Sequence, residues 1–267
     1  MSMVSNNNHN STINVRVWQD HAGGILYEPQ LLEPRLLSKL DQPVGHELFE
    51  PGYWQRRGSA QQQRGGRGSV VFINDSECHW VLRHYRRGGL IGKLIADRYL
   101  WWGAEATRAF CEWRLLASLH AQGLPVPKPV AARYVRSGVS YRADLITEVI
   151  PQARTLAELL SAAPLNKQGW QQLGEIIARF HAVGVRHADL NAHNIVFDAN
   201  QHIFLLDFDR GRICSVDPGW INHVLQRLLR SLNKLQAQRA LHFQPSDWQH
   251  LVQVHDACLA QLRLARA

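Results

Sequence analysis

The residues that could do chemistry lie close together in the second half of the chain. Residues 187–194 read HADLNAHN, and the apolar run FLLDFD that follows ends in two acids, Asp207 and Asp209. A carboxylate can orient a hydroxyl group for attack, and carboxylate and amide oxygens are good ligands for Mg2+. Phosphoryl transfer needs these parts. We therefore predict that Asp189 orients an acceptor hydroxyl and that Asn194 and Asp207 hold a metal ion.

Each of these residues also has an ordinary structural explanation. Asp189 and Asn194 could cap turns, and the acids after the apolar run could be exposed surface residues. For any one acid alone, that explanation would be the better one. The elements occur in one order, with 18 residues from Asp189 to Asp207, and this ordered set favours the catalytic interpretation.

A glycine-rich stretch lies upstream. Residues 64–69 read RGGRGS and lead directly into the strand-like run Val70–Ile73. Backbone N–H groups can approach phosphates closely where side chains are missing, so we predict that Gly65, Gly66 and Gly68 contact the phosphates of a nucleotide. A flexible hairpin tip is the alternative explanation, and the motif alone does not exclude it.

A basic residue on the next predicted strand extends this set. Residues 80–85 read WVLRHY, the return strand of a hairpin, and Arg83 lies on it. Apolar spacing predicts a helix over residues 104–120, which carries Glu105 and Glu112. Either glutamate could belong to a solvated helix face.

The elements around these residues change from strands to helices along the chain. We expect a ragged, disordered start over residues 1–12, then an N-lobe over about 13–147 and a C-lobe over about 151–267, joined near Thr147–Pro151. The remaining predicted elements are strands at 142–150, 195–197 and 203–206 and helices at 156–160, 168–180, 220–235 and 245–265.

Composition describes a globular chain with a basic balance. The 267 residues include 30 Lys+Arg against 22 Asp+Glu, a net charge of +8, and only five of the basic residues are lysines. Residues 51–100 hold nine basic and three acidic residues, so +6 of the excess lies there, and an anionic partner is plausible. No nucleic-acid motif accompanies it, so we expect no nucleic-acid partner.

The spacing of cysteines and histidines and the lengths of apolar runs argue against several classes of protein. The four cysteines are widely spaced without a CxxC pair, which favours a reducing compartment and no disulfide scaffold, and the histidines lack metal-ligand spacing. The first ten residues lack the apolar core of a signal peptide, and no apolar run reaches 18 residues. We expect a soluble or peripheral protein.

The ordered motif resembles that of the protein-kinase-like superfamily, H-x-D-x-x-x-x-N followed by D-F-G. Within it, VLRHYRRGGLIGKL, FCEWRLL, HADLNAHNIVFD and LLDFDRGRI resemble the lipopolysaccharide-core sugar kinases that act on 3-deoxy-D-manno-octulosonic acid (Kdo), over about residues 50–235. The resemblance implies an α+β, bilobal protein-kinase-like fold, with a β-rich N-lobe and a mainly helical C-lobe. It also implies ATP as donor, Mg2+, and a Kdo hydroxyl on a lipid A precursor as acceptor. Known members phosphorylate the 4-hydroxyl.

Two departures narrow the family. Arg83 stands where kinases have a phosphate-binding lysine, and Asp209 replaces the last glycine of D-F-G. The resemblance therefore implies that Arg83 pairs with the nucleotide phosphates and that Glu112, or its competitor Glu105, braces Arg83. A long activation segment and A-P-E are missing, which argues against a phosphorylation-controlled protein kinase. By the same resemblance, Glu148 lies at the hinge where backbone groups would meet adenine. An aminoglycoside-type or atypical protein kinase, or a non-catalytic binder, are the alternatives.

The connection between Arg83 and Glu112 is longer than in most kinases, at 28 residues, and interleaves basic and aromatic residues. This pattern suits anionic headgroups, so Arg86, Arg87 and Lys93 are predicted to bind the acceptor at an anionic membrane surface. The resemblance implies a peripheral position on the cytoplasmic side of the bacterial inner membrane. Packing of the apolar side on the N-lobe is the alternative. Trp101 and Trp102 are the tryptophans that we expect at such an interface.

Overall fold

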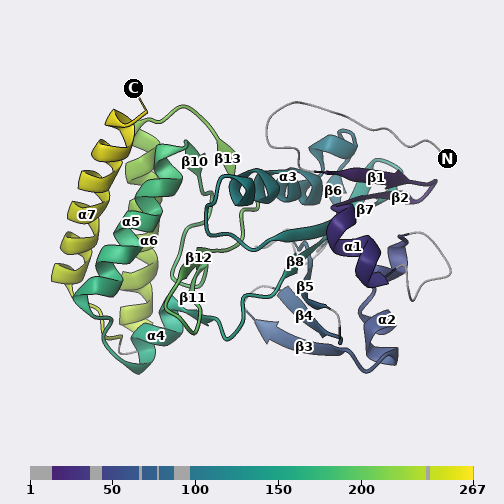
Figure 1. Cartoon of the computed structure of the whole chain (residues 1–267), viewed down its shortest axis with the longest axis horizontal. Coiled ribbons are helices and arrows are strands. Elements are labelled where there is room, and N and C mark those ends of the chain that lie inside the picture. The colour runs from purple at the N-terminus through teal and green to yellow at the C-terminus, as the bar shows by residue number, and fades with distance from the viewer. Residues whose placement is uncertain are drawn as a thin grey trace. The chain divides into compact units, whose positions relative to one another are not determined.

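The computed structural model describes residues 14–36, 44–65, 68–76, 78–86, 97–238 and 241–266. The chain divides into two compact units (Figure 1), of which the first comprises Met1–Gln122 and Pro127–Val149 and the second Gly123–Val126 and Ile150–Ala267. Residues 1–12, where we predict disorder, lie outside the described residues.

The first unit is built on one antiparallel sheet with the strand order β1-β2-β7-β8-β5-β4-β3, and β6 pairs with β8. Its strands are β1 (Arg16–Gln19), β2 (Gly23–Tyr27), β3 (Ala60–Gly65), β4 (Gly68–Asn74), β5 (His79–His84), β6 (Tyr99–Leu100), β7 (Pro129–Ser137) and β8 (Ser140–Glu148). Its helices are α1 (Pro29–Leu36), α2 (Pro51–Arg56) and α3 (Arg108–Ala121), with 3-10 turns at His46–Phe49 and Ala104–Ala106.

The predicted hairpin at residues 70–85 is confirmed as β4 and β5, whose register pairs Val70 with Arg83. The described part of the glycine-rich stretch before it belongs to strands. Residues 60–65 form β3, and Gly65 pairs with Gly68, the first residue of β4, while residues 66–67 lie outside the described residues.

Helix α3 packs against β7 and β8 because its apolar residues fall on one side. Phe110, Trp113 and Leu116 are all buried. The predicted start at residue 104 is wrong by four residues, since a separate 3-10 turn precedes the helix. Gly123, with φ of +70°, and the prolines after it carry the chain away from the helix end.

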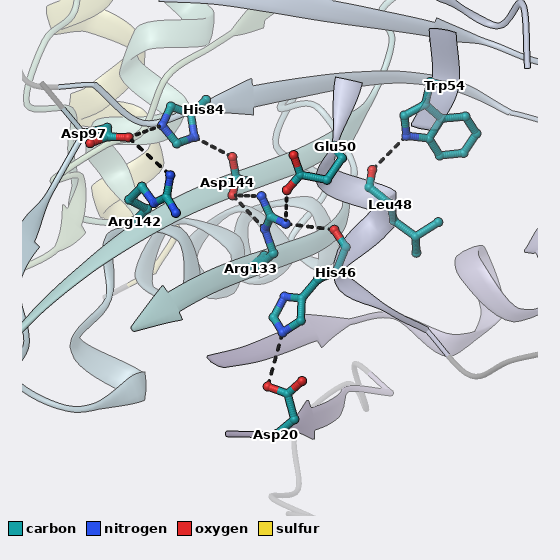
Figure 2. A network of polar contacts seen from close by, with 10 residues as sticks. All are labelled: Asp20, His46, Leu48, Glu50, Trp54, His84, Asp97, Arg133, Arg142 and Asp144. Atoms are coloured by element: carbon teal, nitrogen blue, oxygen red, sulfur yellow. Dashed lines mark hydrogen bonds and ion pairs between the residues drawn. The ribbon is translucent and has the colours of Figure 1, made fainter. Parts of the chain in front are cut away.

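A polar network crosses the sheet of the first unit (Figure 2). Arg133 on β7 is buried and donates to Asp144 at 2.9 Å, to Glu50 at 2.7 Å and to the carbonyl of His46 at 2.8 Å. His84 contacts the other oxygen of Asp144 at 2.6 Å. The hydrogen bond to Asp144 is the main cause that raises the pKa of His84 above its ordinary value. The network therefore joins β5, β7 and β8 to the segment before α2.

The second unit is mainly helical. Its helices are α4 (Leu156–Ala162), α5 (Lys167–Ala182), α6 (Pro218–Gln238) and α7 (Pro245–Leu264), and its short strands are β9 (Arg154–Thr155), β10 (Val185–Arg186), β11 (Ile195–Phe197), β12 (Ile203–Leu205) and β13 (Arg212–Ile213). Each helix and each strand that we predicted in this part of the chain is confirmed, with ends shifted by up to three residues. Thr155 and Glu158 form a capping box that fixes the start of α4.

Helices α5 and α7 pack closely against each other (Figure 1). A Cβ atom on Gly174 would meet the carbonyl oxygen of Leu251 at 2.7 Å, so glycine permits this approach. Further along, His181 and His255 are both buried and share a 2.8 Å hydrogen bond. Burial lowers the pKa of His181 to about 3 and also lowers the pKa of His255, so this contact joins two neutral rings. No helix in the described part of the chain is long and apolar enough to cross a membrane.

Candidate active site

The loop after β10 is held by a buried histidine. His187 Nε2 lies 2.9 Å from the carbonyl oxygen of Leu206, and His187 Nδ1 accepts a hydrogen bond from the backbone N–H of Asp189 at 3.1 Å. Burial lowers the pKa of His187, which keeps the ring neutral, with Nε2 as donor and Nδ1 as acceptor. The imidazole therefore fixes the backbone that carries the Asp189 carboxylate.

Two amide side chains complete this loop. Asn191 and Asn194 both donate from Nδ2 to the carbonyl oxygen of Asp189, each at 2.9 Å. The amide nitrogen of Asn194 is used in this way, so the group that Asn194 can offer to a ligand is its oxygen. The loop thus turns back on Asp189 and holds Asn194 beside it.

Asp207 is tied to the same loop through its neighbour. The backbone N–H of Leu206 donates to the carbonyl oxygen of Asn194 at 2.9 Å, which brings the chain at Asp207 alongside Asn194. Asp207 itself has a φ of 61°, in the left-handed region. The following Phe208 is buried between His187, at 4.7 Å between ring centroids, and Phe180, at 5.8 Å.

The donor set fits Mg2+. Asn194 and Asp207 offer oxygen atoms, the ligand type of a hard cation. Among the described residues, no group of three His, Cys, Asp or Glu side chains forms a metal cluster. Magnesium in phosphoryl-transfer sites is commonly held by one or two protein oxygens together with phosphates and water, and these two residues suffice for that arrangement.

A residue that we did not predict contacts the Asp189 carboxylate. Arg227 on α6 approaches Asp189 Oδ1 with Nε at 2.7 Å and with Nη2 at 2.5 Å. Both contacts go to the same oxygen, which leaves Oδ2 on the other side of the carboxylate. Both side chains are about 40% exposed, so a ligand can reach the pair. No residue close to Asp189 in the sequence indicates this contact, because the loop itself has no Lys or Arg between Asp189 and Asn194.

In the first unit, Arg83 lies on the Glu112 carboxylate. Arg83 Nη2 is 2.6 Å from Glu112 Oε2, and Glu112 is buried. Tyr85, which we did not predict, donates from its hydroxyl to the same oxygen at 2.6 Å and accepts from Arg83 at 3.3 Å. Glu105 instead forms a two-point ion pair with Arg114 on the protein surface. Of the two glutamates that we considered, Glu112 is the one that contacts Arg83.

The other predicted positions are described only in part. Gly65 on β3 pairs with Gly68 on β4, whereas Gly66 lies outside the described residues, as do Arg87 and Lys93. Arg86 is exposed just after β5. At the end of β8, the N–H of Glu148 donates to the carbonyl of Lys128 and the N–H of Val149 to that of His79, both at 2.9 Å. A nucleotide contact at Glu148 would therefore not use either N–H.

Fold and site residues together define the class of protein. Two units with these features are typical of a protein-kinase-like phosphotransferase. One is a β-rich unit whose arginine is held by a glutamate. The other is a helical unit with an H-x-D-x-x-x-x-N loop and a strand followed by D-F-D. A family model confirms this, since residues 52–255 match the lipopolysaccharide kinase (Kdo/WaaP) family. The chain belongs to this family. The predicted α+β, kinase-like fold is confirmed, and the protein is a phosphotransferase with an alcohol group as acceptor.

Similar proteins bear the same kind of name. A protein of Stenotrophomonas maltophilia (strain R551-3) is 45% identical over 210 residues, which are 79% of this chain and 84% of that protein. A Vibrio vulnificus (strain YJ016) protein is 42% identical, covering 77% of this chain and 86% of its own. A Xylella fastidiosa (strain M23) protein is 41% identical, covering 88% and 90%. All three are named 3-deoxy-D-manno-octulosonic acid kinase.

Proposed function

We propose that this chain transfers the γ-phosphoryl group of ATP to a hydroxyl group of Kdo in lipopolysaccharide biosynthesis, and that the acceptor is Kdo on a lipid A precursor. The names of relatives at 41–45% identity support the Kdo acceptor. The 4-hydroxyl is the position that known members of the family phosphorylate. The acceptor is lipid-linked, so we place the enzyme peripherally on the cytoplasmic side of the bacterial inner membrane.

One observation supports the transfer chemistry most directly. Arg227 contacts only Oδ1 of the Asp189 carboxylate, so Oδ2 is available to accept the hydrogen bond of an acceptor hydroxyl. In the transfer, the hydroxyl oxygen forms a bond to the γ-phosphorus while the bond from that phosphorus to the ADP oxygen breaks. The hydroxyl proton passes to Asp189. Arg227 holds the carboxylate in the orientation that this step requires, and is a positioning residue.

The remaining side chains of the proposed site would bind and orient Mg2+ and the nucleotide phosphates. Asn194 and Asp207 would hold Mg2+, which neutralises charge on the β- and γ-phosphates when it is bound. Arg83, fixed by Glu112 and Tyr85, would pair with the nucleotide phosphates as the usual lysine does, but as a fork that can contact two oxygens.

The other predicted contacts complete this proposal. Gly65, Gly66 and Gly68 would cover the phosphates with backbone N–H groups, and Glu148 would lie near adenine. Three basic residues would bind the phosphates and carboxylate of the acceptor: Arg86, Arg87 and Lys93.

The test offers the full-length protein Mg-ATP with a Kdo-bearing lipid A precursor, beside an aminoglycoside and a generic protein substrate. We expect mass gain of one phosphoryl group on the Kdo acceptor alone, and none when EDTA replaces Mg2+. A precursor that lacks the 4-hydroxyl should stay unmodified. Transfer to the aminoglycoside or the protein instead would overturn the proposed substrate. Asp189→Asn protein is the matched control for contaminating kinases.

A further inference from the structure

Three large apolar side chains are exposed together at one end of the first unit's sheet. In the described part of the chain, Trp102 is 80% exposed, Val139 78% and Leu100 61%. Leu100 pairs with Ser140, and the N–H of Trp101 donates to the carbonyl of Val139 at 2.9 Å. The end of β6 and the β7–β8 turn therefore lie side by side. We call Leu100, Trp102 and Val139 the apolar tip.

Folding does not require these three residues to be apolar, because the inward positions of the same segment already fill the core. Tyr99 is buried, and its ring lies 5.6 Å from that of Tyr141. Trp101 packs on Tyr134 at 5.0 Å between centroids. Leu100 and Trp102 alternate with these inward residues and therefore point outward. Their apolar surfaces are exposed to water and contribute little to packing.

Arginines surround the apolar tip. Arg98 and Arg142 are exposed and line a small hollow together with the two serines of the β7–β8 turn, Ser137 and Ser140. Arg136, also exposed, lies over the ring of Trp101 at 4.9 Å. An acid does approach this group, since Asp97 lies 4.0 Å from Arg142.

We propose that the apolar tip docks on an anionic lipid bilayer. Tryptophan favours the headgroup level, where its apolar ring and polar N–H are both satisfied, and leucine and valine can enter the acyl boundary beside it. At that depth the arginines meet the lipid phosphates, so charge and apolar surface act at the same interface. The docking surface deepens the proposed function, on which it rests for the lipid-linked acceptor, and it names residues outside the predicted acceptor-binding set.

Vesicle co-sedimentation of the full-length protein tests the docking. The protein should bind phosphatidylcholine vesicles that contain phosphatidylglycerol, and bind weakly to phosphatidylcholine alone. Leu100→Ser with Trp102→Ser should lower the partition coefficient at least about tenfold. Arg98→Gln with Arg142→Gln should lower it about thirtyfold, from about fivefold for each basic residue. Leu264→Ser with Arg263→Gln, which changes a more exposed leucine and an exposed arginine in the other unit, should leave it unchanged.

A second measurement starts from the native protein and uses a conservative variant. Brominated lipids should quench the fluorescence of the native protein, and Trp102→Phe should remove most of that quenching. Equal vesicle binding by the wild type and the Leu100/Trp102 variant would overturn the proposal. So would a change in self-association of that variant without any change in vesicle binding, because the surface would then bind a second copy.

The proposed kinase activity can be separated from the docking. The tip variants should phosphorylate a water-soluble Kdo acceptor at the wild-type rate. Loss of activity on every Kdo acceptor with intact vesicle binding would contradict the proposed function and leave the docking surface standing.

Discussion

Two arginine–aspartate pairs in this molecule have the same chemistry and opposite settings. Arg133 and Asp144 in the first unit are almost fully buried, with 8% and 3% of their side chains exposed, whereas Arg227 and Asp189 in the second unit are about 40% exposed. In the buried pair, Arg133 and His84 occupy both oxygens of Asp144 (Figure 2). In the exposed pair, Arg227 occupies one oxygen of Asp189.

This difference distinguishes a carboxylate with a structural role from one that is suited to a reaction. A carboxylate whose oxygens are both bonded inside the protein can stabilise the fold but has little capacity left for a substrate. A carboxylate that is oriented at one oxygen and open at the other can accept a proton from a ligand. The buried pair should therefore control stability, and the exposed pair should control turnover.

The largest expected effect is at the exposed carboxylate. Asp189→Asn keeps the size and the contact surface of the side chain but removes the proton acceptor. We expect kcat to fall by about a hundredfold or more, with the KM for ATP nearly unchanged. Steady-state kinetics measure both. Near-wild-type turnover would contradict the role of Asp189 in the mechanism. The midpoint of thermal unfolding should change little, because the pair is exposed.

The next effect is on stability, at the buried pair. Asp144→Asn leaves buried Arg133 with the exposed Glu50 as its remaining charge partner, so we expect a loss of about 3 kcal/mol in the free energy of unfolding. Denaturant titration measures it. Asp97→Asn is the matched control, since Asp97 is one-third exposed and contacts the same His84. A smaller loss for Asp144→Asn than for Asp97→Asn would contradict the structural role of the buried pair.

The third effect tests the positioning role of Arg227. Arg227→Gln should lower kcat about tenfold while both KM values stay close to the wild type, because orientation rather than binding is lost. Arg227→Lys should recover part of the activity. Arg230→Gln, an exposed arginine on the same helix, is the control and should leave kcat unchanged. A fall in stability without a change in kcat would show that Arg227 is structural, like Arg133.

The smallest effect is the pH dependence of the buried network. The pKa of His84 is raised in the folded protein, so the folded state holds its proton more tightly than the unfolded state. The stability from this contact is complete below pH 6.5 and is lost as the pH rises through the folded pKa, by at most about 1.4 kcal/mol per pH unit. Denaturation between pH 6 and 9 should show a slope that His84→Gln reduces. An unchanged slope in that variant would contradict the assignment.

The sequence predicted best where chemistry is contiguous. The loop around Asp189 fits within eight consecutive residues, so residue types and spacing were enough to predict that Asp189 and Asn194 lie together. Arg227 was not predicted, because it lies 38 residues after Asp189 and reaches it only through the packing of α6. Tyr85 was missed for a similar reason, since it meets Glu112 from another element, 27 residues away.

Some strands were not predictable from periodicity. All five residues of β2 and the first six of β7 are buried, so their sequences do not alternate between apolar and polar. The opposite holds for β3, whose sequence AQQQRG has almost no apolar content. Its conformation depends on pairing with β4, which a local pattern does not encode.

The backbone at Asp207 restricts which substitutions this protein can accept at its proposed metal ligand. With φ of 61°, the position suits glycine, asparagine and aspartate, and a bulkier residue would add steric strain to the loss of an oxygen ligand. An inactive protein for trapping substrate complexes is therefore better made as Asp207→Asn than as Asp207→Ala. Among the residues that this conformation favours, aspartate alone carries a charge, so the substitutions that the backbone accepts most easily at this position all remove the negative charge that the proposed metal ion would bind.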